Sequence, residues 1–166
     1  EHGFFMDDWC FQFMKEHHVF FVPTLAAPYW IQTNGTAAGI PEYAVRKVEK
    51  TMEAHKDTFR RAVAASVPIA LGTDAGTPFN AYDQTAFEAV LMVENGMTPL
   101  EAIRCGTIRS AELLRVSDTH GSIALGKAAD FAIFNENPLE DIHALLSCSM
   151  TVLGGNVVCY ENKFAF

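Results

Sequence analysis

The sequence lacks basic clusters, closely spaced cysteine pairs and long hydrophobic runs. Acidic residues outnumber basic ones by 20 to 12, and the formal net charge is −8 at pH 7. A nucleic-acid-binding surface needs positive charge to meet the phosphates, and the densest basic site here is the pair Arg60-Arg61. The charge balance therefore argues against nucleic acid as a partner.

Cysteine and hydropathy patterns exclude two further classes of protein. None of the four cysteines stands in a CxxC pair, as a zinc finger or redox site would require (Cys10, Cys105, Cys148 and Cys159). We interpret them as free thiols in a reducing compartment and expect a cytoplasmic protein. The most apolar segment, residues 19–31, is interrupted by two prolines, and no stretch reaches membrane-spanning length. We therefore expect no membrane partner.

The apolar content is sufficient for a folded core. The chain has 166 residues, of which 49% are hydrophobic and 19% charged, as in an ordinary globular domain. It opens at Glu1-His2-Gly3 without an initiator methionine or a targeting pattern. We therefore expect it to be part of a longer protein.

The most informative stretch runs from Val67 to Pro78. Residues 67–71 have the composition of a buried strand, and Gly72-Thr73-Asp74-Ala75-Gly76 follows at once. Asp favours turns and helix caps, but it is seldom buried without a partner or a metal. On this stretch alone, Asp74 is either a capping residue or a functional carboxylate.

The segments before this stretch alternate between helix and strand. Helical spacing of apolar residues predicts a helix over residues 6–17, and β-branched and aromatic residues predict a strand over 18–25. Residues 26–40 are interpreted as a loop, and loops of this length are commonly functional. A long helix with an apolar stripe is then expected from Pro41 to Val63.

After the 67–71 strand, the pattern predicts three helices and a small β unit. A helix over residues 82–95 ends at Gly96, Thr98 and Glu101 form a capping box for the next, and Thr107 caps a third. Strands alternating with helices imply a parallel sheet. From Gly121 the sequence pattern becomes that of a small β unit. Strands are expected near residues 129–134, 150–153 and 157–160, with a short helix at 139–146 and a hairpin turn at Gly154-Gly155.

Three stretches together resemble the metal-dependent amidohydrolase superfamily. They are Glu1-His2-Gly3, Gly72-Thr73-Asp74-Ala75-Gly76, and residues 96–141, which include GMTPLEAI, AELL, GSIALGKAAD and NPLED. Within the superfamily the sequence is similar to the imidazolonepropionase-like and Xaa-Pro dipeptidase (prolidase) branch. The resemblance extends over essentially the whole chain and corresponds to the C-terminal half of the family's enzymes.

The resemblance implies an α/β fold built from only part of the family's barrel. Residues 1–116 would be the C-terminal part, strands 6–8, of a (β/α)8 TIM-type barrel, and residues 117–166 part of a small β-sandwich. A whole barrel needs about 200 residues or more, so the upstream half of the same protein would complete it. Because strands 6 and 8 would lack neighbours, we also expect a homo-oligomer.

The resemblance also implies a metal site. His2 matches the strand 6 histidine ligand, and Asp74 matches the strand 8 aspartate, a metal ligand and general base. The family holds one or two divalent ions, usually zinc, and imidazole and carboxylate suit that metal. The remaining family ligands include an HxH pair, and this sequence has no HxH. Those ligands would lie upstream of residue 1.

Other candidate residues follow from position. Thr24 lies at the end of the predicted 18–25 strand, and Tyr29 lies in the following loop. Barrel enzymes recognise substrate at this face, so we predict that both residues contact it. An aromatic anchor for the loop is the alternative role of Tyr29. The other histidines have no ligand spacing and are expected at the surface or at helix ends (His17, His18, His55, His120 and His143). Asp130 is expected to have a structural role.

The implied activity is hydrolysis of a C–N bond, in a small-molecule substrate such as a dipeptide or an N-acyl amino acid. A metal-activated water would attack the carbonyl carbon, with Asp74 accepting its proton. We expect the chain alone to be inactive. Two alternatives remain: an inactive association module that folds only as an oligomer or with its upstream half, and a deaminase of the same superfamily.

Overall fold

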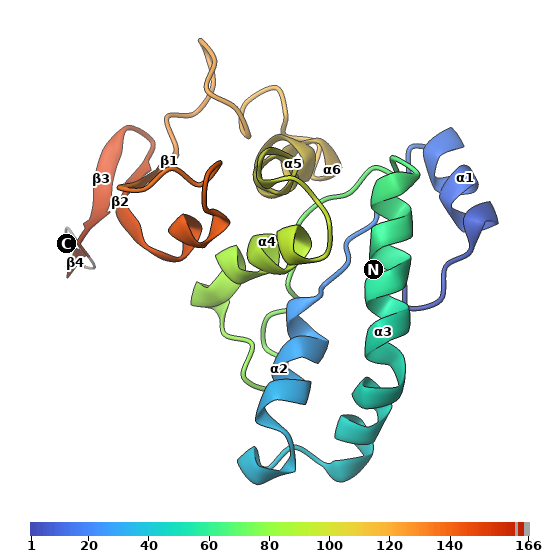
Figure 1. The fold of residues 1–166 in the computed structure, drawn as a ribbon. Coiled ribbons are helices and arrows are strands. Elements are labelled where there is room, and N and C mark those ends of the chain that lie inside the picture. The colour runs from blue at the N-terminus through green and yellow to red at the C-terminus, as the bar shows by residue number, and fades with distance from the viewer. Residues whose placement is uncertain (162, 165–166) are drawn as a thin grey trace.

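Three extended segments lie side by side in the computed structural model, which describes residues 1–161 and 163–164 (Figure 1). The backbone N–H of His2 donates to the carbonyl of Val22 at 3.0 Å. Phe21 N–H donates to the Pro68 carbonyl at 2.8 Å, and Ala70 N–H donates to the Phe21 carbonyl at 3.0 Å. Segments 1–3, 19–24 and 67–72 are therefore adjacent in that order.

The pairing between these segments is shorter than the sequence suggests. The predicted strands 18–25 and 67–71 share a single parallel bridge, between Phe21 and Ile69, rather than a continuous ladder. Pro23 and Pro68 lack the N–H that a ladder needs, which restricts pairing on both segments. Both remain buried, since Phe21 is 1% and Ile69 5% exposed.

Helices surround the three segments, and most of them match the prediction. Helix α1 (Asp8–Glu16) starts where the Asp7 side chain accepts the Cys10 N–H at 2.9 Å. Helix α3 (Glu42–Ala64) follows Pro41, and α4 (Thr85–Glu94) follows a short 3₁₀ turn, η2 (Tyr82–Gln84). Helix α5 (Pro99–Arg104) has the predicted capping box, with both Thr98–Glu101 hydrogen bonds formed.

The predicted loop at residues 26–40 is wrong. It contains helix α2 (Ala26–Asn34) and the 3₁₀ turn η1 (Thr36–Ala38). No side chain at the Leu25 cap position bonds the helix start. The Glu88 carboxyl group accepts the N–H of Leu25 and of Ala26 instead, at 2.7 and 2.8 Å. The cap comes from a residue more than 60 positions away, so no local sequence signal marks this helix.

The predicted cap at Thr107 is also wrong. Helix α5 continues through a π-helical turn, η3 (Cys105–Arg109), into α6 (Ser110–Leu113). Thr107 lies inside this helix, and its Oγ1 donates to the Ile103 carbonyl at 2.7 Å. The Cys105 carbonyl accepts both the Leu71 N–H and the Ser110 hydroxyl. The wider π turn thus presents a carbonyl group to the 67–72 segment.

The C-terminal part forms an antiparallel sheet with strand order β1-β2-β3-β4. The strands are β1 (Phe131–Phe134), β2 (Cys148–Leu153), β3 (Asn156–Tyr160) and β4 (Lys163–Phe164), and the 3₁₀ helix η4 (Ile142–Leu146) precedes β2. The hairpin turn at Gly154-Gly155 is confirmed, with φ of 56° and 81°. Asp130 Oδ1 accepts the Gly154 N–H at 2.7 Å, which is the expected structural role.

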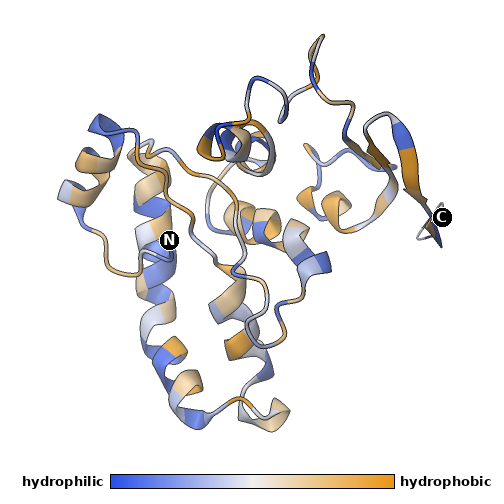
Figure 2. Cartoon of the chain, turned by 180° about the vertical axis from the view of Figure 1, so that it is seen from behind, coloured by the Kyte–Doolittle hydropathy of each residue, from blue (hydrophilic) through white to orange (hydrophobic). Residues whose placement is uncertain are grey.

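Part of the apolar surface stays uncovered. Helix η4 contacts α4 and joins the sheet to the rest of the chain. Figure 2 shows hydrophobic residues along the sheet near the C-terminus, where Leu153 is 58% and Val157 46% exposed. Among the described residues, no helix is both long and apolar enough to cross a membrane.

Candidate functional site

Three predicted site residues share one unusual backbone conformation. His2, Thr24 and Asp74 stand at the C-terminal ends of the three adjacent segments, with φ of 64°, 54° and 55°. Non-glycine residues seldom adopt such left-handed values, and they persist only where the surrounding structure enforces them. The chain therefore turns sharply at the same end of all three segments.

The hydrogen bonds of Thr24 fix the proton of the His2 ring. His2 Nδ1 lies 2.8 Å from Thr24 Oγ1, and that hydroxyl donates its single proton to the Pro23 carbonyl at 2.6 Å. With the hydroxyl proton assigned to the Pro23 carbonyl, His2 Nδ1 is the donor of this pair. In the neutral ring the lone pair is then on Nε2, the state required of a metal ligand.

Asp74 lies in a turn whose hydrogen bonds go to its backbone carbonyl and not to its carboxylate. Asn80 Nδ2 donates to the carbonyls of Thr73 and Asp74 at 2.6 and 3.1 Å, and the Thr77 hydroxyl donates to the Asp74 carbonyl at 3.0 Å. The backbone of Asp74 is held while its side chain is exposed to solvent. The Asp74 carboxylate therefore makes no capping hydrogen bond to the described residues.

A cleft of about 500 Å³ brings these three residues together. His2, Thr24 and Asp74 all line it. Its other walls are mainly apolar and aromatic, with one lysine (Phe4, Phe5, Ala27, Pro28, Ile31, Tyr43, Ala44, Lys47, Val48, Thr51 and Thr77). Lys47 was not predicted, because on the sequence it is one charged residue of many on α3.

Tyr29 is not among the residues that line this cleft. It lies on α2, with its ring centroid 5.0 Å from those of both Trp30 and Phe87. The structure therefore places Tyr29 as the aromatic anchor of its segment and does not bring it together with His2, Thr24 and Asp74.

Two buried polar side chains, His55 and Glu88, lie behind the cleft. His55 Nε2 lies 2.8 Å from the Pro23 carbonyl, and the Phe4 ring stacks on His55 at 4.2 Å between centroids. Burial lowers the pKa of His55, so the ring is neutral and Nε2 donates to Pro23. The expectation of a surface or helix-end position for His55 is wrong, because it is 0% exposed.

Glu88 is the second of these buried groups, and it too is 0% exposed. Burial raises its pKa to about 8, although its bonds from the N–H groups of Ala26 and Leu25 oppose the shift. The sequence signal for Glu88 was available. It is the one charged residue in the apolar run from Ala86 to Val93.

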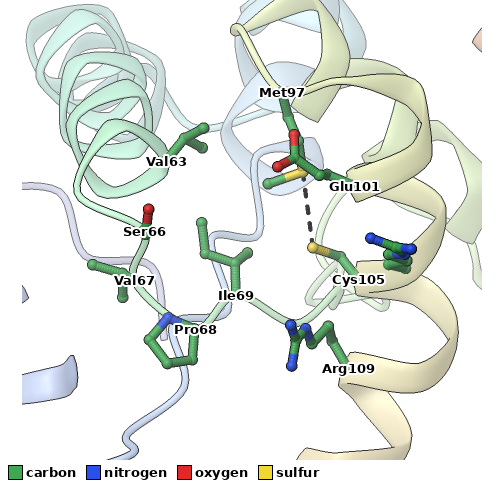
Figure 3. Close-up of a pocket in the computed structure, with 10 residues that line it drawn as sticks. Val63, Ser66, Val67, Pro68, Ile69, Met97, Glu101, Cys105 and Arg109 are labelled. Atoms are coloured by element: carbon green, nitrogen blue, oxygen red, sulfur yellow. Dashed lines mark hydrogen bonds between the residues drawn. The ribbon is translucent and has the colours of Figure 1, made fainter. Parts of the chain in front are cut away.

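A second pocket, of about 280 Å³, lies at the opposite end of the 67–71 segment (Figure 3). Figure 3 shows Val63 and Pro68 on one side of it and Met97, Cys105 and Arg109 on the other. Cys105 Sγ is 3.8 Å from Met97 Sδ, and burial raises the pKa of the thiol to about 12. A thiol that stays protonated is a poor nucleophile or ligand. We therefore assign the candidate site to the cleft at Asp74.

The described residues do not form a complete metal centre by themselves. No group of three or more His, Cys, Asp or Glu side chains within residues 1–161 and 163–164 could hold an ion. His2 and Asp74 fit such a centre as two ligands, because the His2 Nε2 lone pair and the Asp74 carboxylate are left for it.

Comparison with other proteins identifies the family. The sequence model of the Amidohydrolase family matches residues 2–158. Ochratoxinase from Aspergillus niger is 33% identical over 147 residues, which cover 86% of this chain and 29% of that protein. Imidazolonepropionase from Christiangramia forsetii is 39% identical over 82 residues, covering 48% of this chain and 20% of the relative.

Solved structures agree over nearly the whole chain. A Xaa-Pro dipeptidase with methionine bound in its active site has a TM-score of 0.85 and 36% identity, covering 94% of this chain and 38% of that one. A putative prolidase from Bifidobacterium longum has a TM-score of 0.89 and 28% identity, covering 99% and 42%. The chain thus spans under half the length of each of these relatives.

These matches confirm the fold that the sequence resemblance implies. The chain is part of a TIM-barrel amidohydrolase region followed by a small antiparallel sheet, and it is similar to both the imidazolonepropionases and the prolidases. By its match over residues 2–158, the chain belongs to the amidohydrolase family.

Proposed function

We propose that this chain is the C-terminal part of a zinc-dependent amidohydrolase that hydrolyses the C–N bond of a dipeptide or an N-acyl amino acid. The observation that carries the proposal is the convergence of His2, Thr24 and Asp74 on one cleft. The four cysteines are free, which supports the reducing, cytoplasmic location included in this proposal.

His2 and Asp74 would hold the metal through Nε2 and a carboxylate oxygen, with the remaining ligands supplied by the upstream half of the protein. When bound, zinc supplies a water activated for attack and polarises the scissile carbonyl. Asp74 accepts the proton of the attacking water and then returns it to the leaving nitrogen. Thr24 keeps the His2 ring oriented, since its hydroxyl is already engaged by His2 and Pro23.

The walls of the cleft support the substrate class. Lys47 offers a positive charge to a substrate carboxylate, while Phe4, Ile31 and Tyr43 offer apolar and aromatic surface to a side chain or acyl group. A dipeptide or N-acyl amino acid carries both features. Barrel enzymes bind substrate at the face formed by the C-terminal ends of their strands, where this cleft lies.

The test is hydrolysis by the full-length, zinc-loaded protein of a panel of Xaa-Pro dipeptides, other dipeptides and N-acyl amino acids. Release of a free amino acid from at least one of these classes is the expected result, and Lys47→Met should raise KM more than it lowers kcat. If zinc is bound, no substrate of this panel is cleaved, and amino-substituted rings tested beside it release ammonia, the enzyme is the deaminase instead. Hydrolysis confined to substrates without a carboxylate would contradict the assigned role of Lys47.

A further inference from the structure

Side chains from two helices form hydrogen bonds to the turn at Pro23–Ala26. His55 on α3 bonds the Pro23 carbonyl, and Glu88 on α4 accepts the N–H groups of Leu25 and Ala26. Both side chains are 0% exposed. Burial of such groups is costly unless they are hydrogen-bonded, and these bonds all go to the same four-residue turn.

The residue between these bonds is Thr24, whose backbone is in the left-handed region with φ of 54°. A β-branched residue there is a true outlier and needs enforcement by its surroundings. Glu88 accepts the N–H of Leu25, the residue directly after Thr24. His55 bonds the carbonyl of Pro23, the residue directly before it. The strained conformation is therefore fixed at both neighbours of Thr24.

This conformation has a consequence at the cleft. It places Thr24 Oγ1 within 2.8 Å of His2 Nδ1, the bond that leaves the lone pair on His2 Nε2. Glu88 and His55 do not line the cleft. Glu88 acts on the site through the turn and the start of α2, whereas His55 also contacts a cleft residue directly, because the Phe4 ring stacks on it.

We propose that Glu88 is a positioning residue that sets the orientation and tautomer of His2 through the Thr24 turn. The proposal rests on the metal-binding role proposed for His2. A carboxyl group that only capped α2 would stabilise the helix without changing metal affinity. The two roles therefore differ in a measurable quantity.

The experiment measures the zinc dissociation constant of the full-length protein by competition with a chromogenic chelator. Glu88→Ala removes both acceptors and should weaken zinc binding by about 10–100-fold, as loss of a group that orients a ligand does. Glu88→Gln keeps one acceptor and the shape, so its effect should be smaller. Met92→Ala is the matched control. Met92 is on the same helix and is 0% exposed, and its side chain makes none of the hydrogen bonds to the turn at residues 23–26. It should leave zinc affinity unchanged.

A double-mutant cycle isolates the route through Thr24. In a Thr24→Val background, Glu88→Ala should change zinc affinity less than about twofold, because the link to His2 is already lost. An equal loss in both backgrounds, or none in either, would overturn the proposal. If Glu88→Ala does not fold, Glu88→Gln takes its place in the cycle.

The same measurements distinguish failure of the proposed metal site from failure of the positioning role of Glu88. If His2→Ala binds zinc as tightly as the parent protein, His2 is not a ligand and the proposed metal site is wrong. If His2→Ala loses affinity while both Glu88 variants keep it, only the positioning role of Glu88 is wrong.

Discussion

His2 Nδ1 lies 2.8 Å from Thr24 Oγ1, across two neighbouring segments of the chain. The bond joins two residues in left-handed conformation, and the Thr24 proton is committed to Pro23. With that assignment, Nδ1 is the donor in the neutral imidazole and Nε2 is available. The predictions below start from this bond and from Asp74, which lines the same cleft.

Replacing Asp74 tests the general base. Asp74→Asn removes the proton acceptor and weakens a metal ligand, so kcat of the full-length enzyme should fall at least ~10²–10⁴-fold, the usual contribution of acid–base catalysis. Asp83→Asn is the matched control, because Asp83 is an exposed acid outside the cleft. Near-normal turnover in a folded Asp74→Asn protein would refute the assignment.

Replacing His2 tests the ligand. His2→Ala should lower the zinc content of the purified full-length protein, measured by elemental analysis. His18→Ala is the control, since His18 is also exposed and also left-handed, with φ of 52°, but lies outside the cleft. Equal zinc content in the parent, His2→Ala and His18→Ala proteins would show that His2 is not a zinc ligand.

The pKa of Glu88 predicts how stability depends on pH. Burial raises it from 4.5 to about 8, so between these values the folded protein binds a proton that the unfolded chain has released. The Glu88 contribution is fully present below about pH 4.5 and is lost as pH rises through 8, a change on the order of a few kcal/mol. Urea midpoints from pH 5 to 9 should fall more for the parent than for Glu88→Gln. Parallel pH profiles would show that Glu88 does not titrate in this range.

The sequence predicted the elements whose signals are local. Asp7 precedes α1, the capping box of Thr98 and Glu101 opens α5, and Gly154-Gly155 forms the β2–β3 turn. Each depends on residues within a few positions of one another, so no tertiary information was needed.

The elements that sequence analysis missed depend on distant partners. Helix α2 starts at a cap supplied by Glu88, and the π turn after α5 presents the Cys105 carbonyl to Leu71. The candidate site divides in the same way. His2 and Asp74 stand in recognisable motifs. Glu88 is visible in the sequence as the one charged residue of an apolar run, but the backbone groups that Glu88 and His55 bond lie on another segment, and no spacing in the sequence reveals them.

The last prediction concerns association of the 166-residue chain by itself. An apolar cleft of about 590 Å³ opens between the α4–α5 helices and the sheet, with Ala86, Ala102 and Phe131 among its lining residues. Nearby, Ile123 is 87% exposed and Leu125 is fully exposed. Apolar surface of this extent usually marks an interface, and the extended segments share only one bridge among the described residues.

We therefore expect the isolated chain to associate at low micromolar concentration, measured by light scattering, and to become monodisperse when joined to its upstream half. The double variant Ile123→Lys/Leu125→Glu should reduce association, because charges on the exposed segment oppose apolar contact. A surface control is Lys50→Glu on α3, which changes charge at an exposed position without removing apolar area. A stable, cooperatively folding monomer of the unmodified chain would show that these surfaces need no partner.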